Sequence, residues 1–154
     1  MRKALNIIVP ILICFLVGVT ASYFQADAIQ TWYPTLNKPS LTPPNIAFPI
    51  AWSIIYLLMG TSIGLILNSN IINKRKISLL FILQLLFNFS WSFSFFYLQN
   101  PLLGLINILI LDILVVFYIL RSYKVFKASS YLFLPYLIWI TFATYLNAYI
   151  WIAN

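Results

Sequence analysis

Tryptophan and carboxamide side chains recur at helical spacing in two apolar segments of this 154-residue chain. The first segment carries Gln84, Asn88, Trp91 and Phe95, and the second carries Trp139, Ala143, Leu146 and Asn147. Residues three or four positions apart lie on one face of a helix, so each segment presents a stripe of aromatic rings, amides and small side chains. Such stripes are typical of an apolar ligand pocket with a few polar groups, and they also supply the hydrogen bonds that join helices in a membrane.

One acidic residue, Asp112, lies within an apolar segment that contains no Lys or Arg to neutralise it. An ionisable residue inside a membrane is a candidate functional group. We expect Asp112 to be protonated, hydrogen-bonded to a neutral donor or in contact with water. Two roles are equally consistent with its position: a hydrogen bond that joins two helices, or a contact with a ligand or a proton.

The chain contains no histidine and a single cysteine, Cys14. The absence of histidine removes zinc sites, His-based acid–base catalysis, Ser–His triads and a haem site with a proximal His. We therefore expect no metal and no resident cofactor. Any reaction would depend on the reactivity of the bound molecule and of oxygen.

The composition indicates an integral membrane protein. Hydrophobic residues make up 63% of the chain and charged residues only 7%, whereas soluble domains carry about 25% charged residues. The net charge is +7, but the basic residues stand in short clusters between apolar runs. That pattern indicates orientation in a membrane rather than nucleic-acid binding.

Five stretches are long and apolar enough to cross a bilayer, which predicts an all-α bundle of five transmembrane helices in a single domain, residues 1–154. The stretches are Ala4–Gln25, Asn45–Leu67, Ile77–Gln99, Leu102–Leu120 and Ser130–Trp151. Asn100-Pro101 predicts a tight turn between the third and the fourth. The connection 26–44 holds four prolines, and we expect it to be ordered, non-helical and able to cover a site.

The distribution of basic residues predicts the orientation of the five spans. The side of the membrane that holds the N-terminus carries eight Lys and Arg residues, and the opposite side carries only Lys38. The positive-inside rule then places the N-terminus in the cytoplasm and the proline-rich connection and the C-terminus outside. Since no Arg- and Ser-rich transit segment begins the sequence, we expect a bacterial plasma membrane.

The first stretch has a second interpretation. Arg2-Lys3, the apolar run and Val19-Thr20-Ala21 are also typical of a cleavable signal peptide. Gly18, Ser22 and Gln25 recur at helical spacing in the same stretch, which favours a span that is retained and packed.

Three segments of the sequence resemble a known family. They are WYPTLNKPSLTPPNIAFPIAWSIIYLLMG at 32–60, QLLFNFSWSFSFF at 84–96 and PYLIWITFATYLNAYIWIAN at 135–154. In order and spacing they resemble the TspO/MBR family of tryptophan-rich sensory proteins, which includes the mitochondrial translocator protein, or peripheral benzodiazepine receptor. The resemblance spans nearly the whole chain.

The resemblance implies a five-helix protein, often a homodimer, with a pocket beneath the first loop that binds porphyrins such as protoporphyrin IX and isoquinoline carboxamide drugs. Some bacterial members are said to break protoporphyrin IX down in the presence of light and oxygen. The sterol motif of the animal members ends in a basic residue where this chain has Ile152. Sterol transport is therefore not inferred.

Matching motifs carry a ligand site over to this sequence. The matched residues are Ser22, Tyr33, Phe48, Trp52, Asn88, Trp91, Trp139, Ala143 and Leu146, and the polar pattern adds Gln84 and Asp112. Trp52 and Trp139 would be the catalytic residues, acting as electron donors or radical partners to a photoexcited ligand. Large aromatic faces suit a flat apolar disc independently of the resemblance.

The sequence thus predicts a membrane receptor or scavenger of porphyrins and similar apolar ligands, with photo-oxidative breakdown as its candidate enzymatic activity. The alternative is a transporter of tetrapyrroles or other lipophilic molecules. Secondary transporters commonly contain two structural repeats, into which five spans do not divide.

Overall fold

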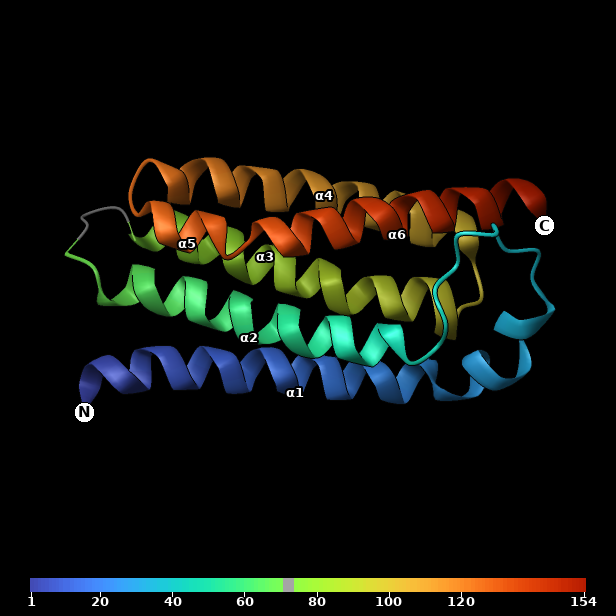
Figure 1. The fold of residues 1–154 in the computed structure, drawn as a ribbon, viewed down its shortest axis with the longest axis horizontal. Coiled ribbons are helices and arrows are strands. Elements are labelled where there is room, and N and C mark those ends of the chain that lie inside the picture. The colour runs from blue at the N-terminus through green and yellow to red at the C-terminus, as the bar shows by residue number, and fades with distance from the viewer. Residues whose placement is uncertain (71–73) are drawn as a thin grey trace.

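A computed structural model describes residues 1–70 and 74–154, and these ranges form a helical bundle. Within them, five helical stretches are long and apolar enough to cross a membrane. They are Arg2–Thr31, Ala47–Asn68, Lys74–Tyr97, Pro101–Tyr123 and Lys127–Ala153. The stretches lie side by side and alternate in direction, with the two termini at opposite ends (Figure 1). The predicted all-α architecture with five spans is confirmed.

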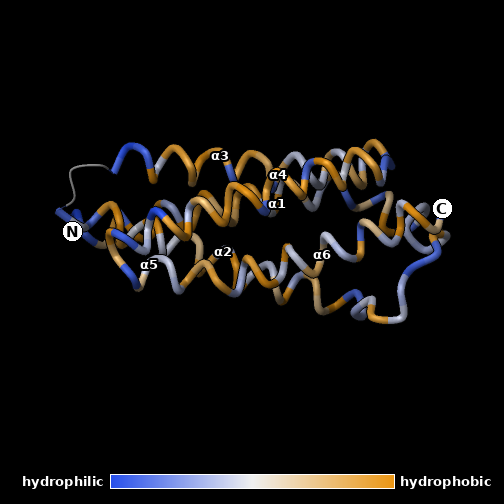
Figure 2. Tube along the Cα trace, turned by 90° about the horizontal axis from the view of Figure 1, so that it is seen from above, coloured by the Kyte–Doolittle hydropathy of each residue, from blue (hydrophilic) through white to orange (hydrophobic). Residues whose placement is uncertain are grey.

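The helical elements follow one another as α1 (Arg2–Thr31), η1 (Tyr33–Thr35), α2 (Ala47–Asn68), α3 (Lys74–Ser92), η2 (Phe93–Tyr97), α4 (Pro101–Tyr123), α5 (Lys127–Tyr131) and α6 (Leu134–Ala153). We call the end that holds the N-terminus and the starts of α3 and α5 the basic end. The end that holds residues 32–46, the α3–α4 turn and the C-terminus is the proline end (Figure 1). Hydrophobic residues dominate the helices between these two ends (Figure 2).

Two local predictions have different outcomes. The tight turn at Asn100-Pro101 is confirmed, because the Asn100 side chain accepts a hydrogen bond from the backbone N–H of Leu103 at 3.0 Å and Pro101 opens α4. The prediction that residues 26–44 are non-helical is wrong for their first part. α1 continues to Thr31 because 26–31 contain neither Pro nor Gly, and it ends just before Pro34.

The fifth span is interrupted between α5 and α6. Pro135 stands in the first turn of α6, where a missing backbone N–H leaves no helical hydrogen bond unmade. Phe133, in the interruption, is completely buried and packs on the Tyr118 ring at 4.0 Å between centroids. The interruption therefore adds an aromatic side chain to the core at the basic end.

The helices pack closely at the basic end, where α1 and α2 approach through glycines. A Cβ atom at Gly60 would meet the backbone of Ile11, and one at Gly64 would lie 2.8 Å from the backbone oxygen of Asn6. Fully buried side chains fill the neighbouring core, among them Met59, Ile66, Tyr118 and Phe133. Small residues allow this close approach in a medium that provides no hydrophobic drive between helices.

We expect Gly60→Ala to push α1 away from α2 and to lower the free energy of unfolding by about 1–3 kcal/mol, as overpacking does elsewhere. Thermal unfolding in detergent, followed by tryptophan fluorescence, measures the effect. Leu57→Ala, on the exposed face of the same helix, is the control and should change the stability by less than about 0.5 kcal/mol. Equal stability of the two variants would contradict the close packing of α1 on α2.

Candidate functional site

A cavity of about 430 Å³ lies in the half of the bundle nearer the proline end. Its wall comes from α1, α2, α3 and α6, together with η1 and η2. The lining residues are Phe15, Gly18, Val19, Ala21, Ser22, Gln25, Ile29, Tyr33, Asn45, Phe48, Pro49, Trp52, Ser53, Tyr56, Asn88, Trp91, Ser92, Phe95, Phe96, Ala143, Leu146, Asn147 and Ile150. The volume falls in the range of roughly 300–1,000 Å³ that is usual for small-molecule sites.

One wall of the cavity is the polar and aromatic stripe of α3. Asn88 is 3% exposed and Phe95 is 2% exposed, so the inward-facing stripe is confirmed for these positions. η2 is a π-helical turn, closed by a hydrogen bond from Leu98 N to Phe93 O at 3.0 Å. Because a π turn adds a residue to the helical repeat, Phe95 and Phe96 are both buried. Phe95 stacks on Trp91, with 5.6 Å between the ring centroids.

Asn88 joins three helices at the inner end of the cavity. The Tyr56 hydroxyl of α2 donates to Asn88 Oδ1 at 3.3 Å, and Asn88 Nδ2 donates to the Tyr136 hydroxyl of α6 at 2.9 Å. Trp52 stacks on Tyr56, with 5.4 Å between the ring centroids and 25° between the planes. The position of the Trp52 indole is therefore coupled to the amide of Asn88 through Tyr56.

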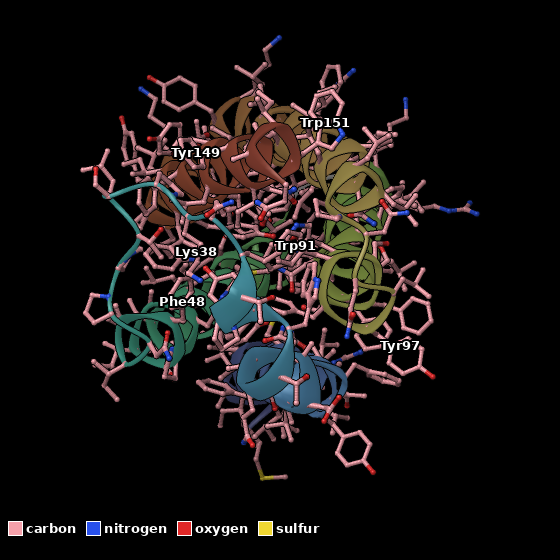
Figure 3. The ribbon with its side chains drawn as sticks, turned by 90° about the vertical axis from the view of Figure 1, so that its right-hand side faces the viewer. Lys38, Phe48, Trp91, Tyr97, Tyr149 and Trp151 are labelled. Atoms are coloured by element: carbon pink, nitrogen blue, oxygen red, sulfur yellow. The ribbon has the colours of Figure 1, made fainter. Side chains whose placement is uncertain are left out.

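Asn147 makes the corresponding connection nearer the proline end. The Trp91 indole N–H donates to Asn147 Oδ1 at 3.1 Å, and Asn147 Nδ2 donates to the backbone oxygen of Pro101 at 2.7 Å. A Cβ atom at Gly104 would lie 2.9 Å from Asn147 Oδ1, so the glycine leaves room for this amide. In the view along the bundle from the proline end, Trp91 lies near the centre, whereas Tyr97, Tyr149 and Trp151 point outward (Figure 3).

Residues 32–46, the segment between α1 and α2, form what we call the roof at the proline end. Lys38 Nζ donates to the backbone oxygens of Tyr33 at 2.7 Å and Leu36 at 3.1 Å. Asn37 N donates to Asn154 Oδ1 at 2.9 Å, which fastens the segment to the end of α6. The hydrogen bonds of Lys38 thus stabilise the conformation of the roof, and that of Asn37 attaches the roof to α6. Burial raises the pKa of the Tyr33 phenol, so this side chain is neutral at physiological pH.

Eight residues of the sequence-derived site line the cavity: Ser22, Tyr33, Phe48, Trp52, Asn88, Trp91, Ala143 and Leu146. Three lie outside its lining: Trp139, Gln84 and Asp112. Trp139 packs edge-on against Phe48, a lining residue, with 5.8 Å between the ring centroids. Its indole therefore supports a wall of the cavity from behind.

Gln84 and Asp112 occupy polar positions in the bundle interior. Gln84 is completely buried, and its two amide atoms have no hydrogen-bond partner among the described residues. Asp112 Oδ2 accepts a hydrogen bond from the Thr144 hydroxyl at 2.7 Å. Two roles were considered for Asp112. This contact corresponds to the first of them, a hydrogen bond that joins two helices, here α4 and α6.

The structure also brings in residues that the sequence-derived site lacked. Phe15, Val19 and Ile29 of α1 and Phe96 of η2 line the cavity with ordinary apolar side chains. No residue type marks them as functional. The helical spacing of Phe15, Val19 and Ser22 could have indicated that this face of α1 lines the site. We recognise no sequence pattern that predicts the π turn, which turns Phe96 inward.

The fold and the cavity define a class: a polytopic helical membrane protein with an aromatic-lined internal cavity at one end. A model of the TspO/MBR family matches residues 10–152. The tryptophan-rich protein TspO of Archaeoglobus fulgidus is 42% identical over 150 residues, which are 97% of each chain. That of Chlorobaculum tepidum is 38% identical over 95% of this chain and 94% of its own. The human translocator protein is 28% identical over 94% of this chain and 85% of its own.

The chain therefore belongs to the TspO/MBR family and is a homologue of the translocator protein. It is an integral membrane protein, with five candidate spans among the residues that the structure describes. The resemblance noted in the sequence is confirmed at the level of the family.

We expect Gln84→Leu to raise the temperature of unfolding, because a buried amide without partners costs about 1–3 kcal/mol relative to an apolar side chain. Ligand affinity should stay within about twofold, since the side chain lies outside the cavity lining. Differential scanning fluorimetry and a ligand titration measure the two quantities. A loss of affinity in this variant would return Gln84 to the binding site.

Proposed function

We infer that this protein is a membrane receptor for flat apolar molecules of the porphyrin class, which bind in the cavity beneath the roof. The observation that carries this inference is that indoles from two helices, Trp52 of α2 and Trp91 of α3, line one cavity. Aromatic side chains stack on a conjugated ring, and each such pair adds about 0.5–1.5 kcal/mol to the effect of burial.

The polar groups of the cavity suit a ligand with a few polar substituents. The amides of Asn88 and Asn147 and the hydroxyls of Ser22 and Ser53 stand among apolar side chains. A free-base tetrapyrrole combines a large apolar disc with ring N–H groups and peripheral carboxylates. Its disc would stack on the aromatic walls, and its carboxylates would remain toward the proline end, near water.

The packing of the bundle favours a receptor over a transporter. Between the cavity and the basic end, the core contains Met59, Ile66, Tyr118 and Phe133, all with zero exposed area. Ser62 adds a hydrogen bond to the backbone oxygen of Ser129 at 2.7 Å across this region. A ligand that crossed the membrane through the bundle would have to displace a close-packed core, which is costly.

We expect Ala143→Phe to fill part of the cavity and to weaken the binding of protoporphyrin IX by about tenfold or more, that is by at least about 1.4 kcal/mol. Quenching of tryptophan fluorescence by the porphyrin measures the affinity. Thr141→Phe, on the exposed side of the same helix, adds the same ring outside the cavity and should change the affinity by less than about twofold. Equal affinity in both variants would contradict binding in this cavity.

We also propose that the protein promotes the light-dependent breakdown of the bound porphyrin. Trp52→Phe combined with Trp139→Phe keeps an aromatic ring at each position but removes the more easily oxidised indole. We expect the double variant to retain most of the binding and to lose product formation under light and oxygen, as followed by absorbance. If turnover continued, the indoles would not be the electron donors.

The orientation follows from the charge at the two ends of the bundle. Arg2 and Lys3 begin α1, Arg75 lies in the first turn of α3 and Lys124 follows the last residue of α4, all at the basic end, whereas Lys38 lies in the roof. Figure 1 shows these helix ends together. We propose that the basic end faces the cytoplasm. In a Cys14→Ala background, a membrane-impermeant maleimide should label Asn37→Cys on intact cells and should label Lys124→Cys only after lysis. The reverse pattern would invert the orientation.

A further inference from the structure

The exposed side chains in the cavity lining gather on two helices. Val19 and Ser22 of α1, Pro49 and Ser53 of α2 and Asn45 just before α2 are exposed. The described lining residues from α3, η2 and α6 are buried or half-buried. The cavity therefore opens sideways, between the parts of α1 and α2 that lie nearer the proline end.

Close contact between α1 and α2 ends where this opening begins. The two helices touch at Gly64 and Gly60, and a Cβ atom at Gly18 would meet the Tyr56 ring. Beyond that contact, toward the proline end, Ser22 and Ser53 stand on the cavity wall with small side chains. Both hydroxyls donate to the backbone of their own helix, Ser22 to Val19 O at 2.7 Å and Ser53 to Pro49 O at 2.8 Å. Among the described residues, neither hydroxyl forms a hydrogen bond across the gap between α1 and α2.

The opening faces the bilayer rather than water. Ser53 lies six residues after Ala47, the first residue of α2, which is about 9 Å along the helix at 1.5 Å per residue. α2 has 22 residues, a length that matches a hydrocarbon core of about 30 Å, so Ser53 stands within the apolar layer. Exposed neighbours on the two helices are also apolar: Leu16 is 66% exposed, Ile50 55% and Ile54 52%.

The route from water is obstructed by the roof. Lys38 binds the backbone oxygens of Tyr33 and Leu36, and Asn37 is fastened to the end of α6. Asn154 Nδ2 also donates to Asn37 O at 3.2 Å, so the contact between the roof and α6 is reciprocal. Opening this route would break several hydrogen bonds, whereas the gap between α1 and α2 is already present.

We propose that the ligand reaches and leaves the cavity from the hydrocarbon layer of the membrane, through a portal between α1 and α2 edged by Val19, Ser22, Pro49 and Ser53. This proposal rests on the proposed function, because it concerns the same cavity and the same apolar ligand class. It makes the bilayer the reservoir of ligand, and it makes the gap between α1 and α2 the route of exchange.

A trapping experiment tests the portal in nanodiscs, with Cys14→Ala as the background. Ser22→Cys with Ser53→Cys is the portal pair, and Asn37→Cys with Asn154→Cys is the matched roof pair. Protein loaded with protoporphyrin IX is bridged by a reducible bifunctional thiol reagent and then mixed with an excess of empty liposomes. Recovery of tryptophan fluorescence reports the release of the porphyrin.

Each pair is compared with itself before bridging, so the effect of the substitutions on affinity cancels. We expect the bridge across the portal to slow release by at least about tenfold and reduction to restore it, while the roof bridge changes the rate by less than about twofold. Trapping by the roof pair alone, by both pairs equally or by neither would overturn the portal. Failure of the unbridged proteins to bind protoporphyrin IX would instead overturn the proposed function.

Discussion

The cavity depends on the hydrogen bonds that two buried asparagine side chains make between helices. Asn88 accepts from Tyr56 and donates to Tyr136, and Asn147 accepts from Trp91 and donates to the backbone of Pro101. In hydrocarbon an unmade hydrogen bond is costly and apolar surfaces provide no net drive to associate, so such amides fix which helix faces turn inward. They also set the direction of the aromatic rings bonded to them. The cavity wall is therefore positioned by a few polar contacts rather than by tight apolar packing.

The bundle changes in character along its length. At the basic end, Gly60 and Gly64 bring the backbones of α1 and α2 into contact, and Tyr118 and Phe133 fill the core. Toward the proline end, the same two helices are separated by a cavity, and a roof that Asn37 fastens to the end of α6 covers it. Close packing at one end is what allows separation at the other, since the helices remain joined while part of their length is free to hold a guest.

Much of this architecture could be predicted from the sequence, because it follows from simple constraints. Apolar length predicts the spans, and helical spacing predicts that Asn88 and Phe95 face inward. Asn100-Pro101 predicts the turn before α4. The rest depends on local details and tertiary contacts that apolar length and periodicity do not encode. α1 continues past Gln25 because nothing in 26–31 stops it, and the π turn at 93–97 rotates Phe96 into the wall. Motif matching did not distinguish Trp52, on the cavity surface, from Trp139, one layer behind.

The central claim is that indoles from separate helices face one cavity that binds an apolar ring. Fluorine NMR of protein labelled with 5-fluorotryptophan tests it directly, because each of the five tryptophans gives its own resonance. Single Trp→Phe variants assign the signals. We predict that protoporphyrin IX shifts the resonances of Trp52 and Trp91, while that of Trp151, which points outward at the end of α6, stays in place (Figure 3). A shift of Trp151 with no change at Trp52 and Trp91 would contradict the account.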